Sequence, residues 1–323
     1  MSDTNLTLTL GPAADTRRPL ALTPGEDLKG YIGAHLGRAL LFFITFTSVL
    51  AVLLILVFVI YRSLAFLSGY SIAEFLASRD WRPTADDPIF GAFAIIVGSL
   101  YVSVAALVFA VPVGVMAAVF LSDIVTWKLR NVVKPIVEIL AAIPSVAYGF
   151  FAVLVLAPWM QKHFGFNTGT NALNAAIILA VMALPTIISV AEDSLSALGR
   201  ELREASYSCG ATRMETILKV VIPAAHSGII AAIVLGMMRA IGETMVVWMA
   251  AGNAAQIPGS LFQPVRTLTA TIAGEMGEAD QVTGSARYHV LFLMALCLLV
   301  TSFGCNLVSE WVVRRSRRKL GGG

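Results

Sequence analysis

The sequence predicts an all-α, polytopic membrane protein with six transmembrane helices. Of its 323 residues, 57% are hydrophobic and only 13% are charged, whereas about a quarter of the residues in soluble domains are charged. The mean hydropathy is +0.80. Six apolar runs are long enough for the roughly 20 residues that a membrane-spanning helix needs. The bilayer is therefore the main solvent of this chain.

The order of polar and apolar segments defines the expected domains. Residues 1–38 are largely polar, and the apolar run after them is too long for a signal peptide, so they are interpreted as a cytoplasmic tail. A transmembrane domain over residues 39–313 follows, and a basic tail, 314–323, ends the sequence. The predicted spans are 39–61, 90–121, 136–159, 172–191, 224–250 and 289–312.

Prolines predict irregularities inside two of these spans. Pro112 and Gly114 predict a break in the second span, because proline removes a backbone donor and crowds the preceding turn. Pro144 predicts an unwound point in the third span, which makes the next residue, Ser145, a candidate for a substrate path. The alternative is a kink without a role in transport.

The distribution of basic residues predicts the orientation. If the N-terminus lies inside, most of the 23 lysines and arginines fall in segments on the cytoplasmic side. Cytoplasmic loops of membrane proteins carry such an excess. Both termini are therefore expected in the cytoplasm.

Two charges lie within the fifth predicted span, in the stretch GMMRAIGETMVVWMA. An arginine at the centre of a span costs about 2.5–3.5 kcal/mol on insertion scales and faces the helix bundle or water. Glu243 follows Arg239 by one helical turn on the same face, so the two are predicted to pair and to lower the cost of burial. The alternative is a pair that only locks two helices together. Thr244 is a further candidate for the path, with helix–helix hydrogen bonding as its alternative role.

The cytoplasmic connection 192–223 is predicted to be structured. The stretch SLSALGRELREASYS has helical spacing, with Arg200 and Glu204 as an i, i+4 pair. Gly210 follows at the place of a helix C-cap, and a second short helix, TRMETILKVV, is expected to run to Pro223. Such a helix–glycine–helix element is suited to docking in a groove of a partner.

This connection resembles the EAA motif of ABC importer permeases. The motif is present as Glu204-Ala205-Ser206, then Gly210, then Val220-Val221-Ile222-Pro223, with every spacing kept and Ser206 as the single departure. The resemblance implies that Glu204, Ala205, Gly210 and Pro223 serve in coupling, and that residues 199–223 dock two ATP-binding subunits. No lysine of the chain follows a glycine, as a P-loop requires, so ATP-Mg is expected on those partners and no enzymatic activity or cofactor in this chain.

Other segments resemble the C-type permeases of high-affinity phosphate importers: residues 81–103, EILAAIPSVAYGF (138–150), RAIGETMVV (239–247) and TLTATIAGEMGEA (267–279). The resemblance implies a type I ABC importer permease fold in the bacterial inner membrane. It also implies a heterodimer with a sister permease and an extracytoplasmic phosphate-binding protein. Phosphate would cross by alternating access, competing with Glu243 for Arg239.

Two other functions remain open on the residues alone. One is an ABC permease for another oxyanion, such as molybdate or sulfate. The other is a secondary transporter that uses Arg239 and Glu243 as an ion relay, against which the coupling motif argues. The four histidines are too scattered to predict a metal site, and the role of segment 251–287 is left undecided.

Overall fold

The computed structural model describes residues 24–165, 168–278 and 284–320. By internal contacts the chain divides into two units, residues 1–57 and 58–323, which are described separately. The described part of the first unit is one helix. This helix, α1 (Pro24–Leu67), begins well before the predicted span 39–61 and continues into the second unit. Proline fits the first turn of a helix.

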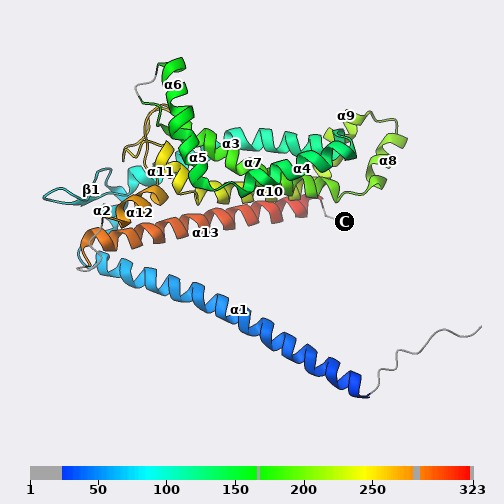
Figure 1. The fold of residues 1–323 in the computed structure, drawn as a ribbon, viewed down its shortest axis with the longest axis horizontal. Helices are drawn as coiled ribbons and strands as arrows, with labels where there is room; N and C mark the ends of the chain where they lie inside the picture. Colours follow the sequence, from blue (N-terminus) through cyan, green and yellow to red (C-terminus); the bar gives the residue numbers. More distant parts are fainter. Residues whose placement is uncertain (1–23, 166–167, 279–283, 321–323) are drawn as a thin grey trace, which may run out of the picture. The chain divides into compact units, whose positions relative to one another are not determined.

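The second unit is also almost entirely helical (Figure 1). Its only strands in the described residues are a short antiparallel hairpin in which Trp81 faces Phe90. Three single π-helical turns, written η, end or join helices. The elements after α1 are α2 (Ile72–Ala77), β1 (Trp81–Arg82), β2 (Ile89–Phe90), α3 (Phe93–Val119), η1 (Phe120–Ile124), α4 (Trp127–Ala142), α5 (Ser145–Phe151), η2 (Ala152–Leu156), α6 (Ala157–Phe164), α7 (Ala172–Ser196), α8 (Arg200–Ser208), α9 (Arg213–Thr216), η3 (Ile217–Val221), α10 (Ile222–Ile241), α11 (Met245–Ala250), α12 (Leu268–Met276) and α13 (Ala286–Leu320).

The number of membrane crossings agrees with the prediction of six. Within the described residues, five helices are long and apolar enough to span a membrane, and a sixth crossing results if α4 and the α5–α6 segment count as one broken span. These two parts meet at 88°, at the predicted irregularity before Ser145. The last span, α13, extends past the predicted 289–312 to Leu320, so residues 314–320 of the expected tail are helical.

Helix α7 forms the centre of the second unit, and α3 and α10 both pack against it (Figure 1). Small residues allow the close approach. A Cβ atom added at Gly114 of α3 would lie 2.7 Å from Ile187 of α7, and one added at Gly236 of α10 would lie 2.5 Å from the same side chain. Ile187 therefore fills a notch in each neighbour.

Two predicted helix boundaries are wrong. The second span does not break at Pro112 and Gly114, because α3 runs through both, and Gly114 serves packing against α7. The short helix expected to end at Pro223 instead continues as one helical segment, Arg213–Ile241. Pro223 lies in the first turn of α10, where a missing N–H group is tolerated.

The fifth span, predicted as a continuous helix over 224–250, is broken instead. Helix α10 ends at Ile241 and α11 begins at Met245. Gly242 is the C-cap of α10, and glycine is a poor residue for a helix interior. The break falls inside the RAIGETM stretch and separates Arg239 from Glu243.

Segment 251–287, whose residues 279–283 lie outside the described part, folds onto the helices. At the start of α7, the N–H groups of Ala172 and Leu173 donate hydrogen bonds to the carbonyl oxygens of Gln263 and Leu261 in its loop. A Cβ at Gly98 would lie 2.4 Å from the carbonyl oxygen of Arg266, so the loop crosses α3 where only glycine fits. Helix α12 then packs against α13 and α3.

Candidate functional site

Arg239 and Glu243 do not form the predicted pair. No ion pair or hydrogen bond joins them in the described structure. Arg239 is half-buried near the end of α10, and its buried Nε has no hydrogen-bond partner. The i, i+4 geometry assumed a continuous helix, and the break at Gly242 removes it. The guanidinium lies within electrostatic range of Tyr148 on α5 instead.

Glu243 stabilises the start of α11. Its Oε1 accepts a hydrogen bond from the backbone N–H of Val246 at 3.4 Å, and its carbonyl oxygen accepts one from Thr269 Oγ1 at 2.8 Å. A carboxylate near a helix N-terminus is favourable because the free N–H groups there carry partial positive charge. Glu243 thus joins the fifth span to the segment that leads into α12.

Glu243 also lines a small cavity that sequence reasoning missed. The cavity has a volume of about 10 Å³, roughly the space of one water molecule. Hydroxyl groups from two elements line one part of it, since Ser99 and Ser103 lie on α3 and Thr267 and Thr269 lie at the start of α12. Apolar residues line the rest: Val102, Leu179, Ala240, Ile241 and Val247. The alternating threonines of TLTAT were the signal that could have identified it.

The other two path candidates lie at the two helix breaks. Ser145 is the first residue of α5, directly after the 88° bend, and Thr244 directly precedes α11. Helices α5 and α11 pack against each other, and a Cβ at Gly149 would lie 2.6 Å from Met249 Sδ. The breaks in the third and fifth spans are therefore neighbours, and Arg239 lies beside them. The Tyr148 hydroxyl donates to the carbonyl of Leu140 at 2.9 Å and ties α5 to α4 across the bend.

The four predicted coupling residues are all exposed. Glu204 and Ala205 are exposed on α8, and Gly210 adopts φ +83° just after that helix, where a helix C-cap was predicted. The Gly210 and Ala211 N–H groups donate to the carbonyls of Tyr207 and Ser206 and close the turn. Pro223 is exposed in the first turn of α10.

Ser206, the departure from the motif, has a structural partner. Its hydroxyl lies 2.9 Å from the hydroxyl of buried Thr216, so it holds α8 against α9. Thr212 and Glu215 form a capping box at the start of α9. The predicted coupling segment, residues 199–223, therefore contains a helix–turn–helix, and its exposed large apolar side chains are Leu202, Tyr207, Met214 and Leu218.

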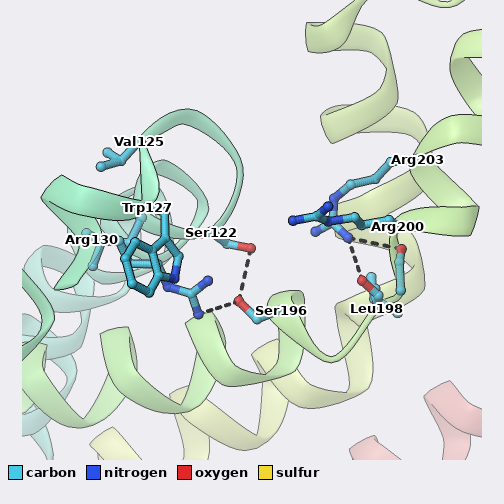
Figure 2. Close-up of a pocket in the computed structure, with 10 residues that line it drawn as sticks. Ser122, Val125, Trp127, Arg130, Ser196, Leu198, Arg200 and Arg203 are labelled. Atoms are coloured by element: carbon cyan, nitrogen blue, oxygen red, sulfur yellow. Dashed lines mark hydrogen bonds between the residues drawn. The ribbon is translucent and has the colours of Figure 1, made fainter.

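A network of ion pairs that the sequence did not reveal lies next to this segment. Glu192 of α7 has a side chain that is 1% exposed, and it accepts hydrogen bonds from Arg130 and from Lys134, the latter at 2.7 Å, both on α4. Arg203 of α8 pairs with Asp123 of η1 at 2.7 Å. Beside the network is a cavity of about 490 Å³, whose lining includes Ser122, Trp127, Arg130, Ser196, Arg200 and Arg203 (Figure 2).

A second ion-pair cluster lies where the β-hairpin meets α12 and α13. Glu275 of α12 pairs with Arg266 at 3.3 Å and with Arg287 at 2.5 Å, and it accepts a hydrogen bond from Trp81 Nε1 at 3.4 Å. Arg287 also pairs with Glu278. Among the described residues, no group of three or more His, Cys, Asp or Glu side chains could hold a metal ion, and the cysteines are free.

Comparisons with known proteins identify the relatives of this chain. Residues 110–321 match the family described as "Binding-protein-dependent transport system inner membrane component". A probable ABC transporter permease protein, YqgH of Bacillus subtilis, is 41% identical over 78% of this chain and 81% of its own length. The phosphate transport system permease protein PstC of Mesorhizobium japonicum is 35% identical over 77% and 80%, and PstC of Pasteurella multocida is 33% identical over 77% and 82%.

Solved structures share the fold at low identity. A bacterial ABC transporter involved in the import of alginate superposes with a TM-score of 0.61 at 15% identity, covering 88% of this chain and 99% of its own. The MetNI methionine ABC transporter, in inward-facing conformations, gives a TM-score of 0.54 at 20% identity, with coverage of 68% and 93%. The predicted importer-permease fold is therefore confirmed.

Proposed function

The chain belongs to the binding-protein-dependent transport system inner membrane components, and from this premise we propose that it is the permease subunit of an ATP-driven importer of inorganic phosphate. The observation that carries the proposal is the similarity to several proteins named as phosphate transport permeases, each over about four fifths of its length. Family membership and the coupling motif argue against a secondary transporter, and the separation of Arg239 from Glu243 argues against an ion relay between them.

Arg239 is the proposed phosphate-contacting residue of the path. Its half-buried guanidinium has a buried Nε without a partner, and it lies beside the neighbouring breaks of the third and fifth spans. Guanidinium groups donate paired hydrogen bonds to phosphate oxygens. Because no carboxylate occupies Arg239 here, phosphate would not need to displace Glu243. Ser145 and Thr244 flank the same breaks, and Glu243 would act by holding α11 and α12 in place.

The exposed segment of α8 and α9 is the proposed contact with the ATP-binding subunits, with Glu204, Ala205, Gly210 and Pro223 as its motif positions. Its turn and exposed apolar side chains support this role. Two such subunits would bind ATP-Mg, and a sister permease would form the other half of the path. An extracytoplasmic phosphate-binding protein would deliver the substrate on the side opposite α8. Both termini would then be cytoplasmic.

Uptake of labelled phosphate by the reconstituted importer carrying Arg239→Gln tests the proposal. We expect uptake to fall to background while the complex still assembles and hydrolyses ATP, because glutamine cannot supply the charged donors. Arg79→Gln, at an exposed arginine before the hairpin, is the matched control and should transport as the wild type does. Normal uptake in Arg239→Gln would contradict the role of this residue. Transport of sulfate or molybdate in preference to phosphate by the wild type would contradict the substrate.

A further inference from the structure

The structure joins the coupling segment to the corner between α3 and α4. Two arginines of the segment converge on η1, the π-helical turn at the end of α3. Arg203 Nε donates to Asp123 Oδ1 at 2.7 Å, and Arg213 Nη2 donates to the carbonyl oxygens of Asp123 and Ile124, the second at 3.3 Å.

The carboxylate of Asp123 is buried and depends on Arg203. Its side chain is 5% exposed, and Oδ2 is buried without a hydrogen-bond partner. An ion pair at the protein surface contributes little, but breaking a buried one leaves an uncompensated charge. The position of Asp123 therefore depends on the position of Arg203, which is the property required of a mechanical connection.

Arg203 also holds the end of α7. Its guanidinium donates to the carbonyl oxygens of Leu195 at 3.0 Å, Leu198 at 2.5 Å and Gly199 at 3.3 Å, and Figure 2 shows Arg203 bonded to Leu198 beside the cavity. One side chain on α8 thus contacts both the central helix and the α3–α4 corner. A displacement of α8 acts on both at once.

The connection continues towards the proposed phosphate path. From η1 the chain enters α4, which Arg130 and Lys134 tie to Glu192 of α7. At its other end, α4 is tied across the 88° bend to Tyr148 of α5, and α5 carries Ser145 and neighbours Arg239. Helix α4 therefore extends from the coupling segment to the break beside the path.

We propose that the Arg203–Asp123 pair transmits movement of the ATPase-facing segment to α4 and so to the helix break beside Arg239. Asp123 is in this view a positioning residue that touches neither phosphate nor the ATPase. The inference rests on the proposed function. If it is wrong, the pair only anchors the turn between α7 and α8, and its loss changes stability without changing coupling.

The test measures how strongly the phosphate-loaded binding protein stimulates ATP hydrolysis by the reconstituted importer, together with phosphate imported per ATP. In Asp123→Asn we expect normal basal hydrolysis, stimulation reduced at least about fivefold, which is the low end of typical coupling between sites, and a matching fall in phosphate per ATP. Asp193→Asn is the matched control, because this carboxylate pairs with Lys134 but is 65% exposed and does not contact α8. The control should keep both values.

Two substitutions of Arg203 decide the outcome if Asp123→Asn fails to assemble. Arg203→Lys can keep the ion pair with Asp123 while losing the donors to the α7 carbonyls, whereas Arg203→Gln loses the charge. Coupled transport in the lysine variant with uncoupled hydrolysis in the glutamine variant supports the proposal. Equal behaviour of the two, or normal stimulation in Asp123→Asn, overturns it. A wild-type complex that imports no phosphate would instead reject the proposed function.

Discussion

At the scale of single residues, buried carboxylates organise both ends of the second unit. Glu192 and Asp123 lie beside the coupling segment, and Glu275 lies beside the hairpin. Each is nearly inaccessible to water and is paired with one or two basic side chains. Pairing offsets the large cost of burying a charge, and removal of one member of such a group leaves the other charges without compensation.

Substitution of Glu275 should destabilise the protein strongly. In Glu275→Gln, Arg266 and Arg287 lose the carboxylate they share, so we expect a loss of about 3–5 kcal/mol. Denaturant unfolding of the purified complex, followed by tryptophan fluorescence, measures this. Glu278→Gln is the control, because that side chain is 69% exposed and its pair with Arg287 should contribute less than about 1 kcal/mol. Similar losses in both variants would show that burial does not set the strength of these pairs.

The charged residues also show which features of the site could be predicted from the sequence and why others could not. Arg239 could be selected as a candidate because a charge within an apolar run is a local signal. Its pairing with Glu243 was wrong because it depended on the helix continuing through Gly242. Asp123 and Glu192 were missed because their partners are remote, with Arg203 80 positions after Asp123 and Arg130 62 positions before Glu192. Only the folded chain brings those charges together.

At the scale of elements, glycines determine how the coupling segment turns and how α7 packs. Gly210 is required by its backbone, since φ is +83° while an added Cβ would meet nothing within 4 Å. Gly114 and Gly236 are required by space, because both face Ile187. The motif predicted the first of these roles correctly. The second depended on which helix faces which, and at Gly114 the sequence suggested a break instead.

At Gly210 there is space for a side chain, but the positive φ is unfavourable for residues other than glycine. We expect Gly210→Ala to cost about 1–2 kcal/mol, the penalty of the left-handed conformation, and Gly210→Asn to cost less. Thermal unfolding of the complex and its content of ATP-binding subunits measure stability and docking. Gly199→Ala serves as the control, because Gly199, at the other end of α8, has a negative φ and open surroundings. A larger effect at Gly199 than at Gly210 would contradict this explanation.

Substitutions at Ile187 and Gly236 should have coupled, non-additive effects on stability. A Cβ at Gly236 would lie 2.5 Å from Ile187, so Gly236→Ala is expected to overpack the α7–α10 contact and to cost about 1–3 kcal/mol. The same substitution in an Ile187→Ala background should cost clearly less, because the clashing atoms are gone. Gly304→Ala on α13, where nothing lies within 4 Å, should not destabilise the protein. Additive unfolding free energies would rule out the direct clash.

At the scale of the whole molecule, an even number of membrane crossings predicts that both ends of the chain lie on the same side of the membrane. Counting the bent α4 to α6 segment as one, the described helices supply six possible spans, so both ends and the coupling segment would share one side of the membrane. Composition and periodicity were sufficient for the number of spans, because apolar length is a local property. The excess of lysine and arginine predicts that this side faces the cytoplasm.

Cys209 offers a direct test of this orientation. It is exposed at the end of α8, whereas Cys297 and Cys305 are partly buried on α13. In a variant with Cys297→Ser and Cys305→Ser, a membrane-impermeant maleimide should label Cys209 in inverted membrane vesicles and not in right-side-out vesicles. Asp86→Cys, in the exposed turn of the hairpin and with all three native cysteines replaced, should show the opposite pattern.

The same label also tests which surface meets the ATP-binding subunits. Because Cys209 adjoins Gly210 on the exposed coupling turn, docking of a subunit should slow its modification in inverted vesicles, and stripping the subunits with urea should restore it. Labelling of Cys209 from the outer side would reverse the orientation and place α8 away from any cytoplasmic ATPase. If Cys209 is labelled from the inner side at the same rate with and without bound subunits, the predicted topology is supported, but α8 is rejected as their docking site.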